Sequence, residues 1–120
     1  MLCRNVINIA SILGLRVAQQ VTAYAVCKAG VIQLTKALAL ELARYRVRVN
    51  ALAPGYFETD LNRDFFETDE GAQLVKRIPM RRLGSLSELD GPLLMLASSG
   101  SSFMTGSVIA VDGGHLVSSL

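Results

Sequence analysis

The stretch that decides the fold is VRVNALAPG, residues 47–55, near the middle of the chain. Residues 47–53 form a short, mostly apolar run, which predicts a buried strand. Pro54 and Gly55 stop this strand, because proline has no N–H to give to a sheet and glycine favours a turn. The segments on either side of the strand therefore determine what kind of sheet it joins.

Two further segments have the same character. Residues 5–10 (NVINIA) carry β-branched side chains at short spacing and lead into a loop at Ser11 and Gly14. Residues 107–111 (SVIAV) are similar and end in DGG at 112–114. Both segments predict strands that are closed by turns.

A long helix is predicted between the first two strands. From about Thr22 to Tyr45 the sequence has no proline and a single glycine, and Ala, Leu, Lys and Glu dominate it. This composition favours one continuous helix. Its apolar residues spread around more than one face, so we expect the helix to be buried on two sides.

The chain between the second and third strands is more irregular. Residues 56–86 are polar and aromatic with weak periodicity, which predicts a long excursion with short helices, the kind of loop that often carries function. Ser87 is expected to cap a further helix that runs to about Ser98. The order of strand, helix, strand, excursion, helix and strand predicts the α/β class, with three parallel strands and right-handed crossover helices.

The composition narrows the function. Of 120 residues, 51% are hydrophobic and 18% are charged, and the mean hydropathy is +0.38. This apolar content excludes a disordered chain, while the charge is below the roughly 25% of a typical globular protein, which indicates a surface that is covered or a missing part. The net charge of +2 comes from interspersed residues without a Lys/Arg stripe, so no nucleic-acid partner is expected. The arginines at 44, 46 and 48 are interpreted as solvated charges or helix-dipole partners.

The remaining signals favour a cytoplasmic protein. Cys3 and Cys27 form no C-x-x-C pattern and are too few for a disulfide framework, so both are interpreted as reduced thiols. No secretory signal is apparent, and serine, glycine and threonine interrupt the longest uncharged run, residues 91–111, so no membrane partner is expected. His115 is the one histidine; nothing near it converges on it, so we interpret it as a surface residue and expect no metal site.

Three residues predict an acid–base site at the carboxyl ends of the strands, where parallel sheets bind their ligands. Tyr24 and Lys28 lie one turn apart on the predicted helix, so their side chains share a face. A nearby cation favours the phenolate and lowers the pKa of a tyrosine below its ordinary value of about 10. Ser11, at the end of the first strand, is placed to hydrogen-bond a substrate oxygen. Together these groups suit the movement of a proton on or off a carbonyl or alcohol oxygen.

The Tyr/Lys spacing alone is a weak signal, because any helix surface can carry such a pair. Three accompanying features strengthen it: the strand-end Ser11, the Pro54-Gly55 turn after the second strand, and the DGG turn at 112–114 after the third. The combination favours an active site over a chance pairing.

These motifs closely resemble the short-chain dehydrogenase/reductase family. The resemblance rests on Ser11, on YAVCKAG at 24–30, on RVNALAPG at 48–55 with Thr59, and on Gly106 and VDGG at 111–114. It implies the C-terminal part of a doubly wound parallel-sheet (Rossmann-type) fold. We accordingly expect residues 1–120 to be a single segment, the C-terminal half of one such domain, without the N-terminal half that carries the glycine-rich nucleotide fingerprint.

The resemblance also implies roles for individual residues. Tyr24 is the implied catalytic acid/base, Ser11 polarises the substrate carbonyl, and Lys28 lowers the tyrosine pKa and hydrogen-bonds the nicotinamide ribose. The implied cofactor is NAD or NADP. Its implied contacts are Tyr24, Lys28, Pro54, Gly55, Phe57 and Thr59. The implied substrate-lining residues are Leu13, Tyr56 and Phe65, and residues 56–86 form the substrate lid.

Two functions remain open. The first is an NAD(P)-dependent oxidoreductase that interconverts an alcohol and a ketone by hydride transfer, on a small molecule that the sequence does not identify. The second is a truncated, catalytically inactive fragment of the family that acts at most as an association module, through its helix faces and the unpaired edge of its first strand. The resemblance implies a homodimer or homotetramer, and the predicted two-sided helix is consistent with that.

Overall fold

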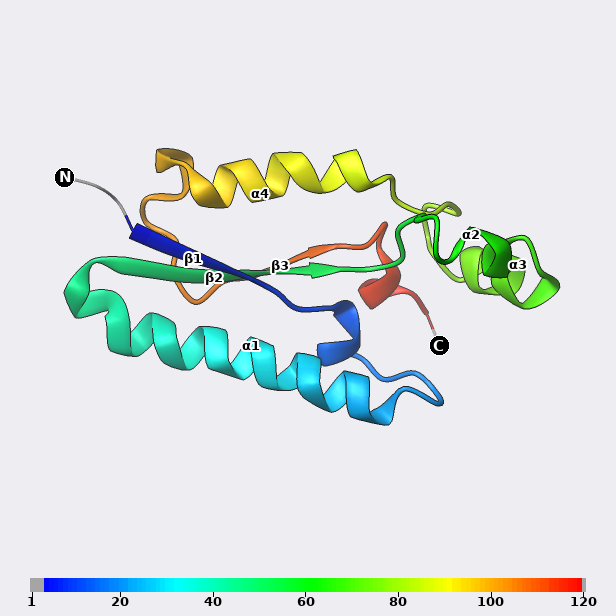
Figure 1. The fold of residues 1–120 in the computed structure, drawn as a ribbon, viewed down its shortest axis with the longest axis horizontal. Helices are drawn as coiled ribbons and strands as arrows, with labels where there is room; N and C mark the ends of the chain where they lie inside the picture. Colours follow the sequence, from blue (N-terminus) through cyan, green and yellow to red (C-terminus); the bar gives the residue numbers. More distant parts are fainter. Residues whose placement is uncertain (1–3, 120) are drawn as a thin grey trace.

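The sheet has three parallel strands in the order β1-β2-β3. The computed structural model describes residues 4–119 (Figure 1). Its strands are β1 (Arg4–Ile9), β2 (Val47–Pro54) and β3 (Val108–Val111). The predicted parallel sheet is therefore confirmed, and each predicted strand lies within a residue or two of its expected place.

β2 is the central strand, and this position explains its apolar sequence. It pairs with β1 on one edge and with β3 on the other. Val49, Ala51 and Ala53 are fully buried, and Leu52, which faces the opposite side, is almost so. A parallel strand that is covered on both faces favours a largely apolar sequence rather than one in which every second residue is polar.

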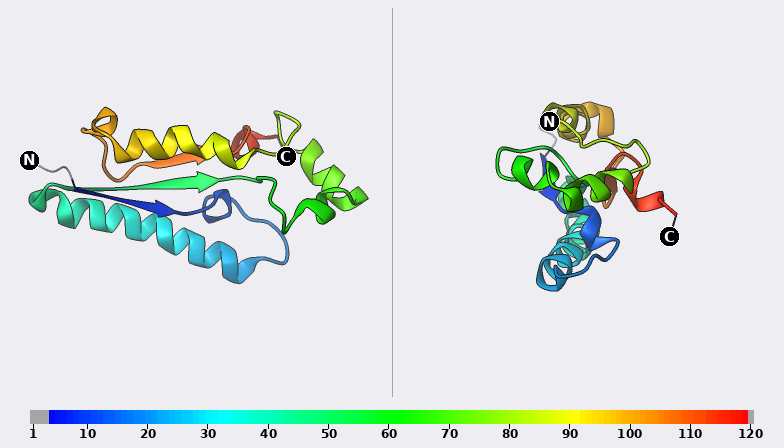
Figure 2. Two further views of the ribbon diagram at one scale, coloured as in Figure 1. Left: turned by 45° about the horizontal axis from the view of Figure 1, so that its top comes forward. Right: turned by 90° about the vertical axis from the view of Figure 1, so that its right-hand side faces the viewer.

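One helix covers each face of the sheet. α1 (Thr22–Leu42), which continues into the short 3-10 helix η2 (Ala43–Tyr45), lies on one side, and α4 (Asp90–Ala97) lies on the other. Figure 1 shows the sheet between these two helices, and the end-on view in Figure 2 shows the same layers.

α1 is buried on one face only, which corrects the expectation of burial on two sides. Ile32, Thr35 and Ala39 are buried against the sheet, whereas Val26 is 66% and Leu40 82% exposed on the other side. The segment Thr22–Tyr45 is also long and apolar enough to cross a membrane, by length and composition only. Its packing on a parallel sheet is the ordinary reason for an apolar helix of this length.

The excursion after β2 contains the predicted short helices. They are α2 (Arg63–Phe66) and α3 (Asp69–Lys76), and they lie beyond the carboxyl ends of the strands (Figure 1). The residue that begins the next helical segment was predicted wrongly. The 3-10 helix η3 (Leu86–Leu89) follows Ser85 rather than Ser87, and the Glu88 carboxylate accepts the Ser85 N–H at 2.9 Å. The spacing of these two residues is that of a capping box.

Two polar side chains of β2 tie the sheet to the segment between α4 and β3. Arg48 is 7% exposed and donates to the Ser101 hydroxyl at 2.9 Å and to the Leu96 carbonyl at 3.2 Å. It is therefore a buried partner of the carbonyl end of α4 rather than a solvated charge. Asn50 is fully buried and donates to the Met104 carbonyl at 2.9 Å, which gives it a structural role.

The structure describes one of the two cysteines that are predicted to be reduced thiols. Cys27 is exposed on α1 and forms no disulfide within the described residues, whereas Cys3 lies outside them. Within residues 4–119 there is also no group of three or more His, Cys, Asp or Glu side chains arranged to hold a metal ion.

Candidate active site

Ser11 follows the end of β1 after one residue, Ala10, and is the N-cap of the 3-10 helix η1 (Ile12–Gly14). Its hydroxyl oxygen accepts the Leu13 N–H at 3.1 Å, and the residue is 7% exposed. Because this bond uses a lone pair of the oxygen, the hydroxyl proton stays free to donate. The serine is thus held in place with its donor available.

Gly14 brings the serine segment against the helix that carries Tyr24 and Lys28. A Cβ atom at Gly14 would lie 2.7 Å from the Lys28 carbonyl carbon and 2.8 Å from the Ile32 Cδ1 atom. Only glycine permits so close an approach. The structure thereby places the segment of Ser11 against the helical turn of Lys28, as the sequence spacing predicts.

Lys28 is fixed beside the Tyr24 ring. Its ammonium donates to the Ile9 carbonyl at 3.0 Å and lies 5.6 Å from the centroid of the Tyr24 ring. An ammonium group has three donors, so two stay available for a ligand. Tyr24 itself is 49% exposed, so its phenol is accessible at the carboxyl end of the sheet.

The Pro54-Gly55 turn packs directly against the turn that follows β3. The Gly55 N–H donates to the Val111 carbonyl at 2.9 Å, and a Cβ atom at Gly55 would lie 2.8 Å from the Cβ of Asp112. Pro54 is the last residue of β2 and pairs with Val111 in the register. The backbone here is therefore packed too closely for a larger residue at position 55.

Phe57 and Thr59 carry unpaired polar groups that suit a carboxamide. Phe57 pairs with Gly84 in an isolated bridge, whose hydrogen bonds use the Tyr56 carbonyl and the Glu58 N–H. The Phe57 N–H therefore faces away from the bridge, and it has no acceptor among the described residues. The Thr59 hydroxyl likewise has no partner within residues 4–119. A carboxamide offers both an acceptor and donors, so these two groups fit the amide end of a nicotinamide.

The predicted substrate-lining residues form only part of a connected set. Leu13 is half-buried in η1, and the Tyr56 ring meets Phe66 edge-on at 6.2 Å. Phe66 in turn contacts Phe65 at 5.2 Å, while Phe65 is 46% exposed. Phe66 thus packs between Tyr56 and Phe65, and the substrate-lining role of Phe65 stays a prediction.

The pKa of the Tyr56 phenol is raised by its surroundings. Burial is the main cause that raises the pKa of the Tyr56 phenol above 10.0, and the phenol of Tyr24 raises it further. Arg77 acts in the opposite direction.

His115 is not the surface residue without neighbours that the sequence indicated. Its ring lies 5.5 Å from the Tyr56 ring, and its buried Nδ1 atom has no hydrogen-bond partner among the described residues. Burial, followed by the positive charge of Arg16, lowers the pKa of the imidazole below 6.5. The DGG turn was a sequence signal for this packing of His115. Gly113 and Gly114 both adopt positive φ and reverse the chain just before His115.

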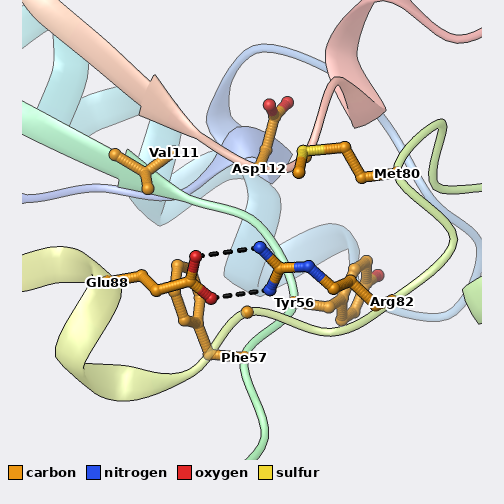
Figure 3. A pocket seen from close by; sticks show the side chains of 9 residues that line it. Tyr56, Phe57, Met80, Arg82, Glu88, Val111 and Asp112 are labelled. Atoms are coloured by element: carbon orange, nitrogen blue, oxygen red, sulfur yellow. Dashed lines mark hydrogen bonds and ion pairs between the residues drawn. The ribbon is translucent and has the colours of Figure 1, made fainter.

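A cavity of about 160 Å³ lies between the lid and the end of β3. Figure 3 shows Tyr56, Phe57 and Val111 around it, with Arg82 and Glu88 joined in a two-bond ion pair of 2.6 and 2.9 Å. The hydrogen bond from Arg82, and then that from the Ser85 N–H, lower the pKa of the Glu88 carboxyl to about 2. The opposite charges here satisfy each other, and the cavity is smaller than the roughly 300 Å³ of typical ligand pockets.

The fold and these residues define the class of protein. The chain belongs to the short-chain dehydrogenase/reductase family: residues 4–115 match the family model described as enoyl-(acyl carrier protein) reductase.

Curated relatives lie within the same family. The chain is 43% identical over 109 residues to the 3-oxoacyl-[acyl-carrier-protein] reductase FabG of Chlamydia trachomatis, which covers 91% of this chain and 44% of the relative. It is also 43% identical over 114 residues to the 2-dehydro-3-deoxy-D-gluconate 5-dehydrogenase of Escherichia coli K12, covering 93% of this chain and 45% of that protein. The chain thus spans a little less than half the length of these relatives.

Solved structures show the same fold. A gluconate 5-dehydrogenase from Burkholderia cenocepacia, in complex with NADP and tartrate, matches with a TM-score of 0.90 and 39% identity over 96% of this chain and 46% of that one. A putative D-mannonate oxidoreductase from Haemophilus influenza with bound NAD matches with a TM-score of 0.91 and 33% identity, covering 96% and 44% of the two chains. The predicted cofactor class, NAD or NADP, agrees with what these relatives hold.

Proposed function

We propose that this chain carries the acid–base machinery of an NAD(P)-dependent oxidoreductase that interconverts an alcohol and a ketone. The observation that carries the proposal is the contact at Gly14, which sets the segment of Ser11 against the turn of α1 that holds Lys28 next to Tyr24. A proton donor, a phenol and a cation thereby share the carboxyl end of the sheet. The names of the relatives support the same reaction class.

Each residue has a defined task in the oxidation direction. The Tyr24 phenolate takes the proton of the substrate hydroxyl, and the Ser11 hydroxyl donates a hydrogen bond to the oxygen that becomes the carbonyl. The Lys28 ammonium stabilises the phenolate through its positive charge. When bound, NAD(P) supplies the hydride chemistry. In reduction, Tyr24 returns the proton to the same oxygen.

Other residues of the chain hold and orient the cofactor in this proposal. The Phe57 N–H and the Thr59 hydroxyl bind the carboxamide, and the two remaining donors of Lys28 reach the nicotinamide ribose. Pro54 and Gly55 shape the floor of the nicotinamide pocket. Leu13 and Tyr56 line the substrate side, with Phe65 and its neighbour in the lid.

A variant of the protein without the Tyr24 hydroxyl tests this proposal. Tyr24→Phe removes the proton-transfer group and is expected to lower kcat at least a hundredfold while the folded structure is kept, because general acid–base catalysis contributes about 10²–10⁴-fold. Tyr45→Phe is the matched control, since Tyr45 lies exposed beyond the far end of α1, where its hydroxyl accepts a hydrogen bond from Arg44 at 2.6 Å and its ring stacks with the same guanidinium. Turnover that survives Tyr24→Phe would sink the assignment.

A non-catalytic association module is the second candidate. It is favoured by the outer edge of β1, which pairs with no other strand among the described residues. Fluorescence titration of the 120-residue chain with NADH and NADPH separates the two functions. Saturable micromolar binding favours the oxidoreductase, and its absence favours the association module.

A further inference from the structure

Asn62 lies at the start of α2, but its side chain does not cap that helix. An asparagine at the N-cap ordinarily accepts an N–H of the first helical turn, and the Asn62 side chain makes no such bond. The amide reaches back to the chain after β2 instead: Oδ1 accepts the Thr59 N–H at 2.9 Å, and Nδ2 donates to the Phe57 carbonyl at 2.8 Å. One side chain thus joins the two residues that are proposed to bind the carboxamide.

These bonds hold Phe57 and Thr59 while leaving one group of each available. In an extended residue the N–H and C=O point to the same side of the chain. The Phe57 carbonyl faces Asn62, so the free Phe57 N–H lies on this side too, opposite the bridge to Gly84. The Thr59 carbonyl accepts the N–H groups of Asn62 and Arg63 at 3.3 and 3.1 Å. The whole Thr59 backbone is therefore engaged in the turn, and its hydroxyl remains for a ligand.

The other side of Phe57 is anchored independently of Asn62. The Phe57 side chain is buried, and a Cβ atom at Gly84 would lie 2.5 Å from its Cε1 atom. The backbones of Tyr56 and Glu58 carry the two hydrogen bonds to Gly84, of 3.0 and 2.9 Å. The segment is thus held by the chain at Gly84 on one side and by the Asn62 amide on the other. A segment fixed in this way presents its donors in one direction and loses little freedom when a ligand binds.

The neighbouring ion pairs of the same turn are of a different kind. Arg63 pairs with Glu58 and with Asp60, both at 3.1 Å, and all three side chains are half or more exposed. Ion pairs in water contribute little to holding a geometry. Asn62 is half-buried, and its two bonds go to backbone groups. The Asn62 amide is therefore the contact that sets the shape of residues 57–59.

We propose that Asn62 is a positioning residue for the carboxamide end of the nicotinamide. It acts through the Phe57 N–H and the Thr59 hydroxyl, whose direction and separation it sets. This inference rests on the proposed oxidoreductase function and adds a residue to its cofactor site. Without the amide, the Phe57 carbonyl and the Thr59 N–H lose their partners, and the segment turns to satisfy them elsewhere. Affinity should then fall for ligands that carry the carboxamide and for those alone.

Two kinds of ligand separate this role from a merely structural one. In the protein that carries these residues, Asn62→Ala should raise the Kd of NADH or NADPH about fivefold or more in a fluorescence titration, because one hydrogen bond is worth about two- to tenfold. ADP-ribose and its 2′-phosphate have the nucleotide without the nicotinamide, so calorimetry should find their Kd unchanged. An equal loss of affinity for both kinds of ligand overturns the positioning role, and so does unchanged affinity for both.

Arg63→Gln is the matched control for Asn62→Ala. It removes the two exposed ion pairs from the same turn and leaves the Asn62 amide in place, so both kinds of ligand should bind as they do to wild-type protein. A rise in the Kd of NADH as large as that caused by Asn62→Ala would show that any loosening of the turn has the same effect. That result would overturn a specific role for Asn62.

A measurement without cofactor tests the contact itself. The Thr59 amide proton should exchange with solvent about tenfold faster in Asn62→Ala than in wild-type protein, as followed by NMR, because Oδ1 no longer accepts it. An exchange rate that does not respond overturns the contact on which the inference depends. Wild-type protein that binds neither NADH nor NADPH would contradict the oxidoreductase function instead, and the cofactor role of Asn62 with it.

Discussion

Gly14 is the residue at which the segment of Ser11 meets α1, the helix that carries Tyr24 and Lys28. Gly14→Ala would place a methyl group 2.7 Å from the backbone of Lys28, and backbone cannot move aside as a flexible side chain can. The free energy of unfolding of the variant should be lower by about 1–3 kcal/mol, which a urea titration would show as a lower midpoint. The variant should also lose activity, since η1 must shift away from α1.

Gly30→Ala is the control for this change. A Cβ atom at Gly30, also on α1, would have no neighbour within 4 Å, so alanine there should keep or raise stability by up to about 1 kcal/mol. Equal urea midpoints for the two variants would contradict the close contact at Gly14.

At the start of the segment that leads into α4, the hydrogen bonds of Glu88 predict a low carboxyl pKa. Glu88 accepts hydrogen bonds from Arg82 and from the Ser85 N–H, which hold its carboxyl pKa at about 2 instead of 4.5. A depressed carboxyl pKa contributes stability above pH 4.5 that is lost as the pH falls through 2. NMR titration of the Glu88 carboxyl should show the low value.

Variants on either side of Glu88 identify its partners. Arg82→Gln should move the Glu88 pKa back toward 4.5, because it removes the hydrogen bond that lowers this pKa most. Ser87→Ala should leave it unchanged, because the cap is made at Ser85. A pKa that responds to Ser87→Ala would restore the cap predicted from the sequence.

The exposed apolar residues on the outer face of α1 predict that the molecule assembles with further copies. Val26, Leu34 and Leu40 are 66%, 50% and 82% exposed, a run of apolar side chains that favours contact with another chain. We therefore expect light scattering to give the mass of a homodimer or homotetramer, with Leu40→Glu shifting the mass toward the monomer. Leu61→Glu, on a side chain that is 99% exposed in the excursion, is the control that should change nothing. A monomeric wild-type mass would contradict this assembly.

The helices and strands could be predicted where they depend on local sequence patterns. The apolar run of residues 47–53 and its Pro54-Gly55 end depend on neighbours in sequence, so β2 was found within one residue. Ser85 was missed because two serines compete for one cap and the Glu88 partner decides between them. The outer face of α1 was expected to be buried because apolar spacing does not tell which partner covers a face.

By itself the sequence determined the strands, the long helix, and the spacing that puts Tyr24 and Lys28 on one face of it. These features follow from chain geometry over a few residues. Only the tertiary structure decided what surrounds them. The Arg16 side chain reaches the carbonyl of His115, a residue 99 positions away, and the Tyr56 ring meets His115 because the DGG turn reverses the chain. Such contacts depend on how the sheet brings the carboxyl ends of its strands together, and no local pattern encodes that.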